Sequence, residues 1–438
     1  MSNPASKGVR CLAVALAASA SAAAVAAEVD YELRAGGSFS DNYQLLPSGQ
    51  ERSATAAVVG VMLDGSRPDG RLKYDLLADL EQYVYLNRDA SSELSGRANL
   101  RGSYDFVPDS FSWTAGLTYD QARRDASRPL APGNSDAQTS FSTGPSLRLR
   151  FSDAMQSDIS AHYSRQDTSS TPVDNSTLGG RMVIQRSTTP RSGLGLGYSY
   201  DDVSYRGALG ASLSDFRRQE VFARMKLTGA RTEVELEGGY ADVSGPLISD
   251  SGPVLRTRLS RRVAPTLSAF LGYVREYPTS DTSALAGTSP TSGASGIGNG
   301  PRISSTGEAG LRMQRPRTNA SLAYYHREEK GILVGDAERK LDEVRADITR
   351  SFTPRARGSL FYNISREDFS QFGSDIDEHS FGAGLELDIG RAASLSFRLR
   401  HSRRDSTASI AGYSETNGGI FLSYGGAVGR PSSVPGSR

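Results

Sequence analysis

The stretch that decides the fold is LELDIGRAASLSFRLRH, residues 385–401. On its first arm every second residue is apolar, and the residues between them include the carboxylates Glu386 and Asp388. After the turn GRAA, a second apolar row alternates with Ser396, Arg398 and Arg400. Alternation with a period of two places all apolar side chains on one face of a hairpin and all charges on the other. The hairpin therefore needs one apolar environment and one wet one.

The same pattern recurs from Glu28 to the end of the chain, in segments of 10 to 14 residues separated by turn residues. Such strands exceed the five or six residues usual in soluble sheets and suit a tilted strand that crosses a bilayer. The segmentation gives twenty strands, eighteen at the fewest, with cores at 29–39, 52–63, 70–84, 93–106, 110–122, 139–151, 155–166, 176–188, 192–205, 216–228, 231–243, 253–263, 266–277, 303–315, 318–328, 340–352, 356–367, 377–389, 393–404 and 414–426.

The connections between these segments alternate in length. Short, turn-rich connections follow the even-numbered segments, as in VPDS at 107–110, TPRA at 353–356 and GRAA at 390–393. Longer polar connections follow the odd-numbered segments, as at 123–138 and 277–302. This alternation is typical of a transmembrane antiparallel up-and-down β-barrel with short periplasmic turns and long extracellular loops. A soluble sandwich has no reason to separate its loops in this way.

The composition and the N-terminus support a secreted barrel. Only 37% of the 438 residues are hydrophobic, which is little for a large buried core, while 15 Phe, 19 Tyr and one Trp argue against disorder. Lys7 and Arg10 precede a short run rich in Ala, and 25–27 fits a small-x-small cleavage site. A membrane anchor is the less favoured alternative. We therefore predict a cleavable signal peptide at 1–27, which holds the only cysteine, a barrel at 28–426 and a flexible tail at 427–438.

Tyrosines recur at the same end of five odd-numbered segments. They are Tyr119, Tyr163, Tyr198 with Tyr200, Tyr273 and Tyr324. Tyrosines at one level form a girdle where the ring meets acyl chains and the hydroxyl meets headgroups. Ordinary cross-strand packing of aromatic rings explains any single strand equally well, but the recurrence favours the girdle.

If the apolar rows meet lipid, the polar rows line a water-filled lumen. The predicted lumen-lining residues are Arg148, Arg150, Arg224, Lys226, Glu233, Glu235, Glu237, Arg256, Arg258, Arg312, Arg345, Asp347, Glu386, Asp388, Arg398 and Arg400. An arginine facing lipid would cost about 2–4 kcal/mol near the midplane, so these rows face inward. All but five of the 50 basic residues are Arg, either through genomic bias or because guanidinium groups suit acidic or hydroxyl-rich solutes. With 49 acidic residues in balance, a nucleic-acid partner is not expected.

No pattern points to catalysis. The four histidines, His162, His326, His379 and His401, show no metal-ligand spacing, and neither a nucleophile elbow nor a phosphate loop is present. His379 follows two acids at a strand end and is the one candidate for a surface enzyme, although a solvated rim residue is the simpler interpretation. We expect no enzyme activity, no cofactor and no metal.

The sequence resembles the outer-membrane β-barrel porins associated with exopolysaccharide biosynthesis. The likeness begins at YELRAGGSFSDNYQLLPSG and continues through hairpins such as SGLGLGYSYDDVSYRG and RGSLFYNISREDFSQFG, over essentially the whole mature chain. The tail after GGIFLSY departs from barrels that stop at an aromatic residue. The resemblance implies a conduit in the outer membrane of a Gram-negative bacterium, through which a polysaccharide leaves the cell.

Other functions stay open at this point. A general diffusion porin for small hydrophilic solutes and a non-conducting scaffold or adhesin that uses its long loops both fit the same pattern. The expected partners are outer-membrane lipid, a polysaccharide or small solutes, and periplasmic export machinery.

Overall fold

A computed structural model describes residues 29–86, 92–123, 130–132, 134–169, 174–206, 215–278, 302–332, 338–370, 374–407 and 412–425. The predicted signal peptide at 1–27, the tail at 427–438 and most of the loop at 277–302 lie outside these residues. Within the described ranges, no helix has the length and apolar character needed to cross a membrane.

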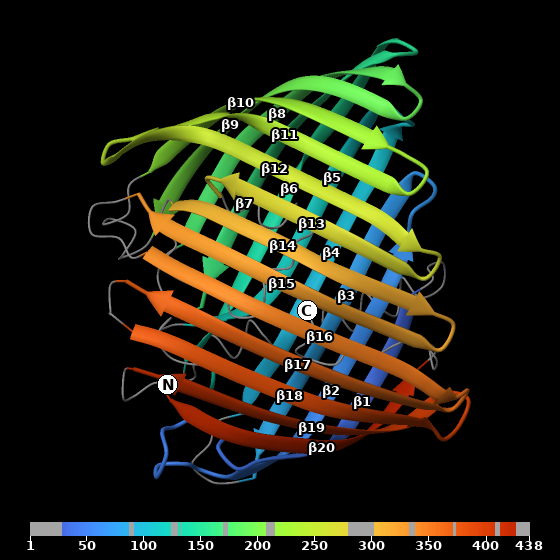
Figure 1. Cartoon of the computed structure of the whole chain (residues 1–438), viewed down its shortest axis with the longest axis vertical. Coiled ribbons are helices and arrows are strands. Elements are labelled where there is room, and N and C mark those ends of the chain that lie inside the picture. The colour runs from blue at the N-terminus through green and yellow to red at the C-terminus, as the bar shows by residue number, and fades with distance from the viewer. Residues whose placement is uncertain are drawn as a thin grey trace.

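The described chain folds into twenty strands that form one sheet. Each strand pairs antiparallel with the next, and β1 also pairs antiparallel with β20, which closes the sheet into an up-and-down barrel as predicted. Figure 1 shows β13–β20 crossing in front of β1–β5, so that two walls enclose one interior. The strands are β1 (Val29–Ser40), β2 (Ala54–Arg67), β3 (Leu72–Tyr85), β4 (Glu93–Val107), β5 (Phe111–Arg123), β6 (Ser135–Ser152), β7 (Met155–Thr168), β8 (Asp174–Thr189), β9 (Ser192–Arg206), β10 (Phe216–Thr228), β11 (Thr232–Gly245), β12 (Ile248–Ala264), β13 (Leu267–Glu276), β14 (Arg302–Arg315), β15 (Thr318–Gly331), β16 (Glu338–Thr353), β17 (Ala356–Phe369), β18 (Ser374–Asp388), β19 (Ala393–Ser406) and β20 (Tyr413–Gly425).

The hairpin at 385–401 forms β18 and β19 in the register that its alternation requires. Leu385 lies opposite Phe397, and Leu387 lies opposite Leu395, so the two apolar rows share one face. Leu399 on that face is 53% exposed. On the opposite face, Arg398 lies 3.4 Å from Glu81 of β3, although β20, β1 and β2 lie between the two strands. Side chains converge only on the concave side of a barrel, so the charged row points inward and the apolar row points outward.

The two ends of the barrel differ. At the turn end, where even-numbered strands finish, the connections are short, as predicted. At the loop end, several strands run further than the sequence pattern indicated: β6 begins at Ser135 rather than at 139, and β12 begins at Ile248 rather than at 253. Only residues 246–247 connect β11 to β12, so this connection breaks the predicted alternation of loop lengths. The reason is that apolar alternation continues through Val243 and Ile248, which are both buried.

The closing seam between β1 and β20 depends on glycine. A Cβ atom at Gly36 would lie 2.2 Å from the backbone oxygen of Ile420, and one at Gly425 would lie 1.9 Å from that of Tyr31. Both distances are far below van der Waals contact. Any larger residue at either position would therefore push the first and last strands apart.

Candidate functional site

One densely paired part of the interior surrounds Arg256 of β12. Its guanidinium lies 2.6 Å from Glu220 of β10, 2.7 Å from Glu237 of β11 and 2.9 Å from Glu276 of β13. Arg181 of β8 also reaches Glu237, at 2.7 Å. We call these five residues the charged wall. Three carboxylates on one guanidinium fix its position, because a carboxylate that leaves water needs a charged or hydrogen-bonding partner.

The strand register explains why the charged wall forms. Arg224, Glu237 and Arg256 are Cα partners across β10, β11 and β12, and so are Lys226, Glu235 and Arg258 two residues further toward the turn end. Opposite charges on facing strands attract across the pair. Near the turn end, the ammonium of Lys226 contacts Glu235 at 2.7 Å and Glu233 at 3.0 Å, with all three side chains about half exposed.

The other predicted lumen residues lie on inward rows of their strands. Arg148 pairs with Asp158 at 2.7 Å, and its neighbour on the row, Arg150, faces Gln156. Arg345 pairs with Glu343 at 2.7 Å, and its guanidinium lies 5.4 Å from the centre of the Tyr325 ring. Between these strands, the Ser321 hydroxyl donates to Asp347 at 3.1 Å and faces Arg312 in the register.

Two charges of the 385–401 hairpin, Glu386 and Arg398, pair with charged residues of other strands. Glu386 accepts a hydrogen bond from Arg357 of β17 at 3.2 Å, and Asp388 faces Ser394. Arg398 contacts Glu81 and lies 4.9 Å from the ring centre of Phe421, while Arg400 donates to Ser402 at 3.0 Å. The cause is the register, which sets Arg398 opposite Gly384 and Arg400 opposite Gly382.

A second ionic centre was missing from the sequence prediction. Arg34 of β1 is almost fully buried and contacts Glu32 at 3.2 Å, Asp79 at 3.5 Å and also Glu81. With Arg398 on the same glutamate, this centre joins β19, β1 and β3. The alternation rule would have found these residues if it had been applied to β1 and β3, since each lies on the polar row of its strand.

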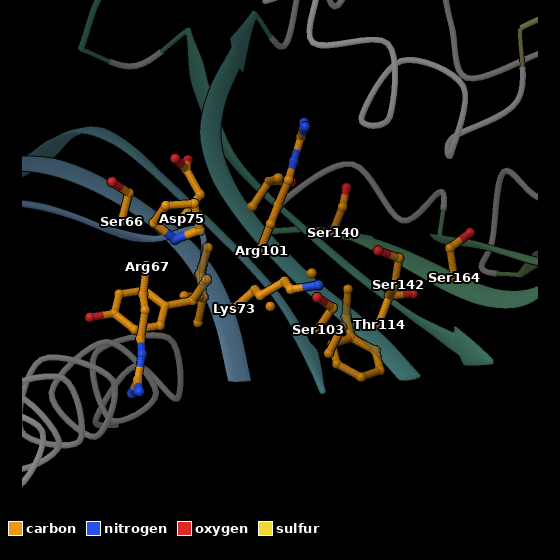
Figure 2. A pocket seen from close by; sticks show the side chains of 18 of the residues that line it. Ser66, Arg67, Lys73, Asp75, Arg101, Ser103, Thr114, Ser140, Ser142 and Ser164 are labelled. Carbon is orange, nitrogen blue, oxygen red and sulfur yellow. The ribbon is translucent and has the colours of Figure 1, made fainter. Parts of the chain in front are cut away.

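A different kind of wall faces the interior from β4 to β7. Its members are small hydroxyl residues: Ser103, Thr114, Ser140, Ser142 and Ser164, which we call the hydroxyl wall. They line a cavity of about 450 Å³ together with Lys73, Asp75 and Arg101. Figure 2 shows the Lys73 side chain lying along the strands toward Ser103, with Ser140, Ser142 and Ser164 on neighbouring strands. The cavity thus offers several hydroxyl groups beside cationic side chains, of which Lys73 pairs with Asp105 at 2.7 Å.

Toward the loop end, the interior holds an apolar cluster around Tyr277, which follows β13. The buried members are Val203, Phe216, Ala241, Val243, Ile248, Val254 and Tyr277. The Tyr277 hydroxyl donates to Asp250 at 3.1 Å, and its backbone oxygen accepts from Arg218 at 2.7 Å. Burial, together with the Asp250 carboxylate, raises the pKa of Tyr277 to about 12. The phenol therefore stays protonated at neutral pH and acts as a donor.

The four histidines occupy separate strands. His326 lies 2.8 Å from Asp342 on the outward face, and His162 lies 3.2 Å from Asp201 on the inward face. His401 contacts Thr416, and His379 lies 3.4 Å from the Tyr362 hydroxyl. Among the described residues, no group of three or more His, Cys, Asp or Glu side chains could hold a metal ion.

Known proteins resemble this chain in fold only. No protein-family model and no curated protein matches the sequence. Among solved structures, the siderophore receptor PirA from Acinetobacter baumannii is 10% identical with a TM-score of 0.50, and covers 91% of this chain and 80% of that one. The FrpB iron transporter from Neisseria meningitidis is 10% identical with a TM-score of 0.51, over 90% and 81%. At 10% identity, this likeness shows the fold alone, a large antiparallel β-barrel.

Proposed function

We propose that this chain is an outer-membrane channel and that the polymer it carries is an exopolysaccharide leaving the cell. The observation that carries the proposal is the hydroxyl-lined cavity in the barrel interior. Saccharides present hydroxyl groups as donors and acceptors, and a wall of Ser and Thr side chains can exchange hydrogen bonds with them without holding any one unit tightly. Passage through a channel requires such weak, repeated sites.

The outer surface supports the membrane setting. Large apolar side chains on the outward rows are exposed on many strands, for example Val59 at 63%, Leu196 at 68% and Leu360 at 58%. Exposed apolar area on this scale marks a surface that another apolar phase covers. Tyr163, Tyr198, Tyr273 and Tyr324 are exposed toward one end of these rows, as a girdle requires, whereas the predicted members Tyr119 and Tyr200 are half-buried. In this setting the turn end is periplasmic and the loop end extracellular.

Conductance across a planar bilayer tests the proposal most directly. Purified protein should conduct ions, and oligosaccharides added to one side should interrupt the current, because a bound chain occupies the cavity. Large, steady conductance that oligosaccharides leave unchanged would instead indicate a general diffusion porin. Absence of conductance under all voltages would favour a scaffold or adhesin.

A cellular experiment tests the direction and the cargo. Deletion of the gene should remove polysaccharide from the cell surface and leave polymer in the periplasm, where the proposed export machinery delivers it. The matched control is complementation with the intact gene. An unchanged amount of surface polysaccharide would contradict the export role while leaving a channel for another solute intact.

A further inference from the structure

One ion pair joins strands that are far apart in the barrel. The Arg123 guanidinium, at the end of β5, lies 3.4 Å from the Glu367 carboxylate of β17. Even on the shorter path, β18–β20 and β1–β4 lie between these strands, and Figure 1 shows β17 on the near wall and β5 on the far one. In a circular barrel of twenty strands they would lie roughly 40 Å apart, more than the two side chains can span. Part of the chain therefore extends across the loop end of the barrel, between the end of β5 and β17.

The pairing pattern shows how β5 reaches across. β5 pairs with β4 only as far as Tyr119, and its last residues pair with β6 alone. On the other side, pairing between β6 and β7 begins at Gln138, so Ser135 and Asp136 have β5 as their only strand neighbour. We call Asp120–Arg123 with Ser135–Ala137 the arm. Among these residues Ala137 exchanges hydrogen bonds with Ser169 next to β7, and beyond this point the two-stranded ribbon has no strand pairing on either side that would keep it in the wall.

Side-chain contacts show the direction of the bend. Gln121, Arg123 and Ser135 continue the outward rows of β5 and β6, so on an undistorted wall they would face away from the interior. Instead, Gln121 accepts from Ser95 at 3.4 Å, and Ser135 donates to Glu93 at 2.9 Å, both on the inward row of β4. Glu367, the partner of Arg123, also belongs to an inward row. All three contacts require the arm to turn inward over the opening.

Glu367, which Arg123 contacts on the opposite wall, also has an ionic partner on its own wall. Glu367 contacts Arg339 of β16, which in turn contacts Glu329 of β15 at 3.4 Å. The guanidinium of Arg339 lies 5.8 Å from the ring centre of Phe369, which is fully buried. The carboxylate of Glu367 thus already has one cationic partner on its own wall. Loss of Arg123 removes the second cation and leaves a paired carboxylate behind.

We propose that the arm is a closing element of the loop-end mouth, that the Arg123–Glu367 pair holds it shut, and that release of this pair widens the opening. The inference goes beyond the proposed function, because it concerns the width of the mouth whatever the solute. Arg123 is the removable half of the pair, since the contacts of Glu367 with Arg339 persist without it.

Cross-linking tests whether the arm is closed. Arg123→Lys keeps the charge of the pair, and a carbodiimide, which couples an ammonium to a carboxylate in contact with it, should join residue 123 to Glu367, with the linked peptides identified by mass spectrometry. The matched control is Arg366→Lys, since Arg366 precedes Glu367 but lies on the outward row and pairs there with Asp375. Linkage of residue 123 to Glu367, with residue 366 joined only to Asp375, supports the closed arm. Absence of linkage between residue 123 and Glu367, or equal linkage of residue 366 to Glu367, overturns it.

Labelling of an interior cysteine tests whether the pair limits the mouth. In intact cells, maleimide-polyethylene glycols of graded size should label Thr114→Cys, on the hydroxyl wall, only up to a size limit. Adding Arg123→Gln should raise this limit, whereas Arg123→Lys, which keeps the charge, and Arg366→Gln, which breaks an exposed outward pair, should not. An unchanged limit in Arg123→Gln protein that still shows heat-modifiable migration of a folded barrel overturns the proposal. Neither readout requires conductance or polysaccharide export, so a failure here is separate from a failure of the proposed function.

Discussion

The charged wall and the hydroxyl wall face the same interior but differ in the length and pairing of their side chains. Around Arg256, long side chains from β8 to β13 form ion pairs with one another, and Glu220 is 1% exposed. From β4 to β7, short side chains leave a cavity of about 450 Å³ between them. Both satisfy the same alternation rule, since both are polar rows of strands. The difference teaches that a polar row in a barrel can either fill the interior or leave room for a solute, and that side-chain length decides which.

The largest effect should follow from removing the centre of the charged wall. Arg256→Met leaves the buried Glu220 carboxylate without its cation, and breaking a buried pair in this way costs about 3 kcal/mol. Urea unfolding of the protein in lipid vesicles should show this as a lower free energy of unfolding. The matched control is Lys226→Met, whose exposed pairs with Glu233 and Glu235 should contribute less than about 1 kcal/mol. Equal losses in the two variants would mean that water reaches Glu220 freely and that the two kinds of pair do not differ.

An intermediate effect is expected from the hydroxyl wall. Thr114→Cys should react quickly with a small charged methanethiosulfonate reagent, because Thr114 is exposed and lines the cavity. Added bulk and charge at this point should lower the single-channel current by about half, since conductance follows the width and charge of the lining. Leu196→Cys, on the outward row of β9, serves as the control and should stay unmodified in a bilayer. Reaction at both sites, or at neither, would contradict the assignment of inward and outward faces.

The smallest effect should come from an exposed ion pair on β6 and β7, two strands of the hydroxyl wall. Arg148 and Asp158 are 2.7 Å apart but 46% and 30% exposed. Arg148→Ala should therefore change the free energy of unfolding by no more than about 0.5 kcal/mol, because exposed pairs gain little over hydration. A loss close to that of Arg256→Met would show that neither the burial of a pair nor the number of carboxylates in it sets its contribution to stability.

The sequence was sufficient to predict where the strands lie, how many there are, and which residues form the apolar and the polar face of each strand. These follow from alternation and turn residues within each hairpin, which are local, and LELDIGRAASLSFRLRH already fixes the register of β18 against β19. It was not sufficient for contacts between strands that are distant in the barrel. Arg398 with Glu81 and Arg123 with Glu367 depend on how the wall bends, which no pattern within one strand records. The sequence pattern also did not predict the short connection between β11 and β12. The number of residues between two strand cores does not show whether those residues form a loop or extend both strands.

The glycine seam also bears on how the barrel is made. β1 cannot complete its pairing until β20 lies beside it, and these two strands are separated by almost the entire chain. Closure of so long a segment carries a high entropic cost and comes late. Until then β1 presents an unpaired edge, which is a template for wrong pairing. Gly36 and Gly425 let the last strand approach its final partner without side chains in the way, so the seam sets the final step of folding as well as the shape of the wall.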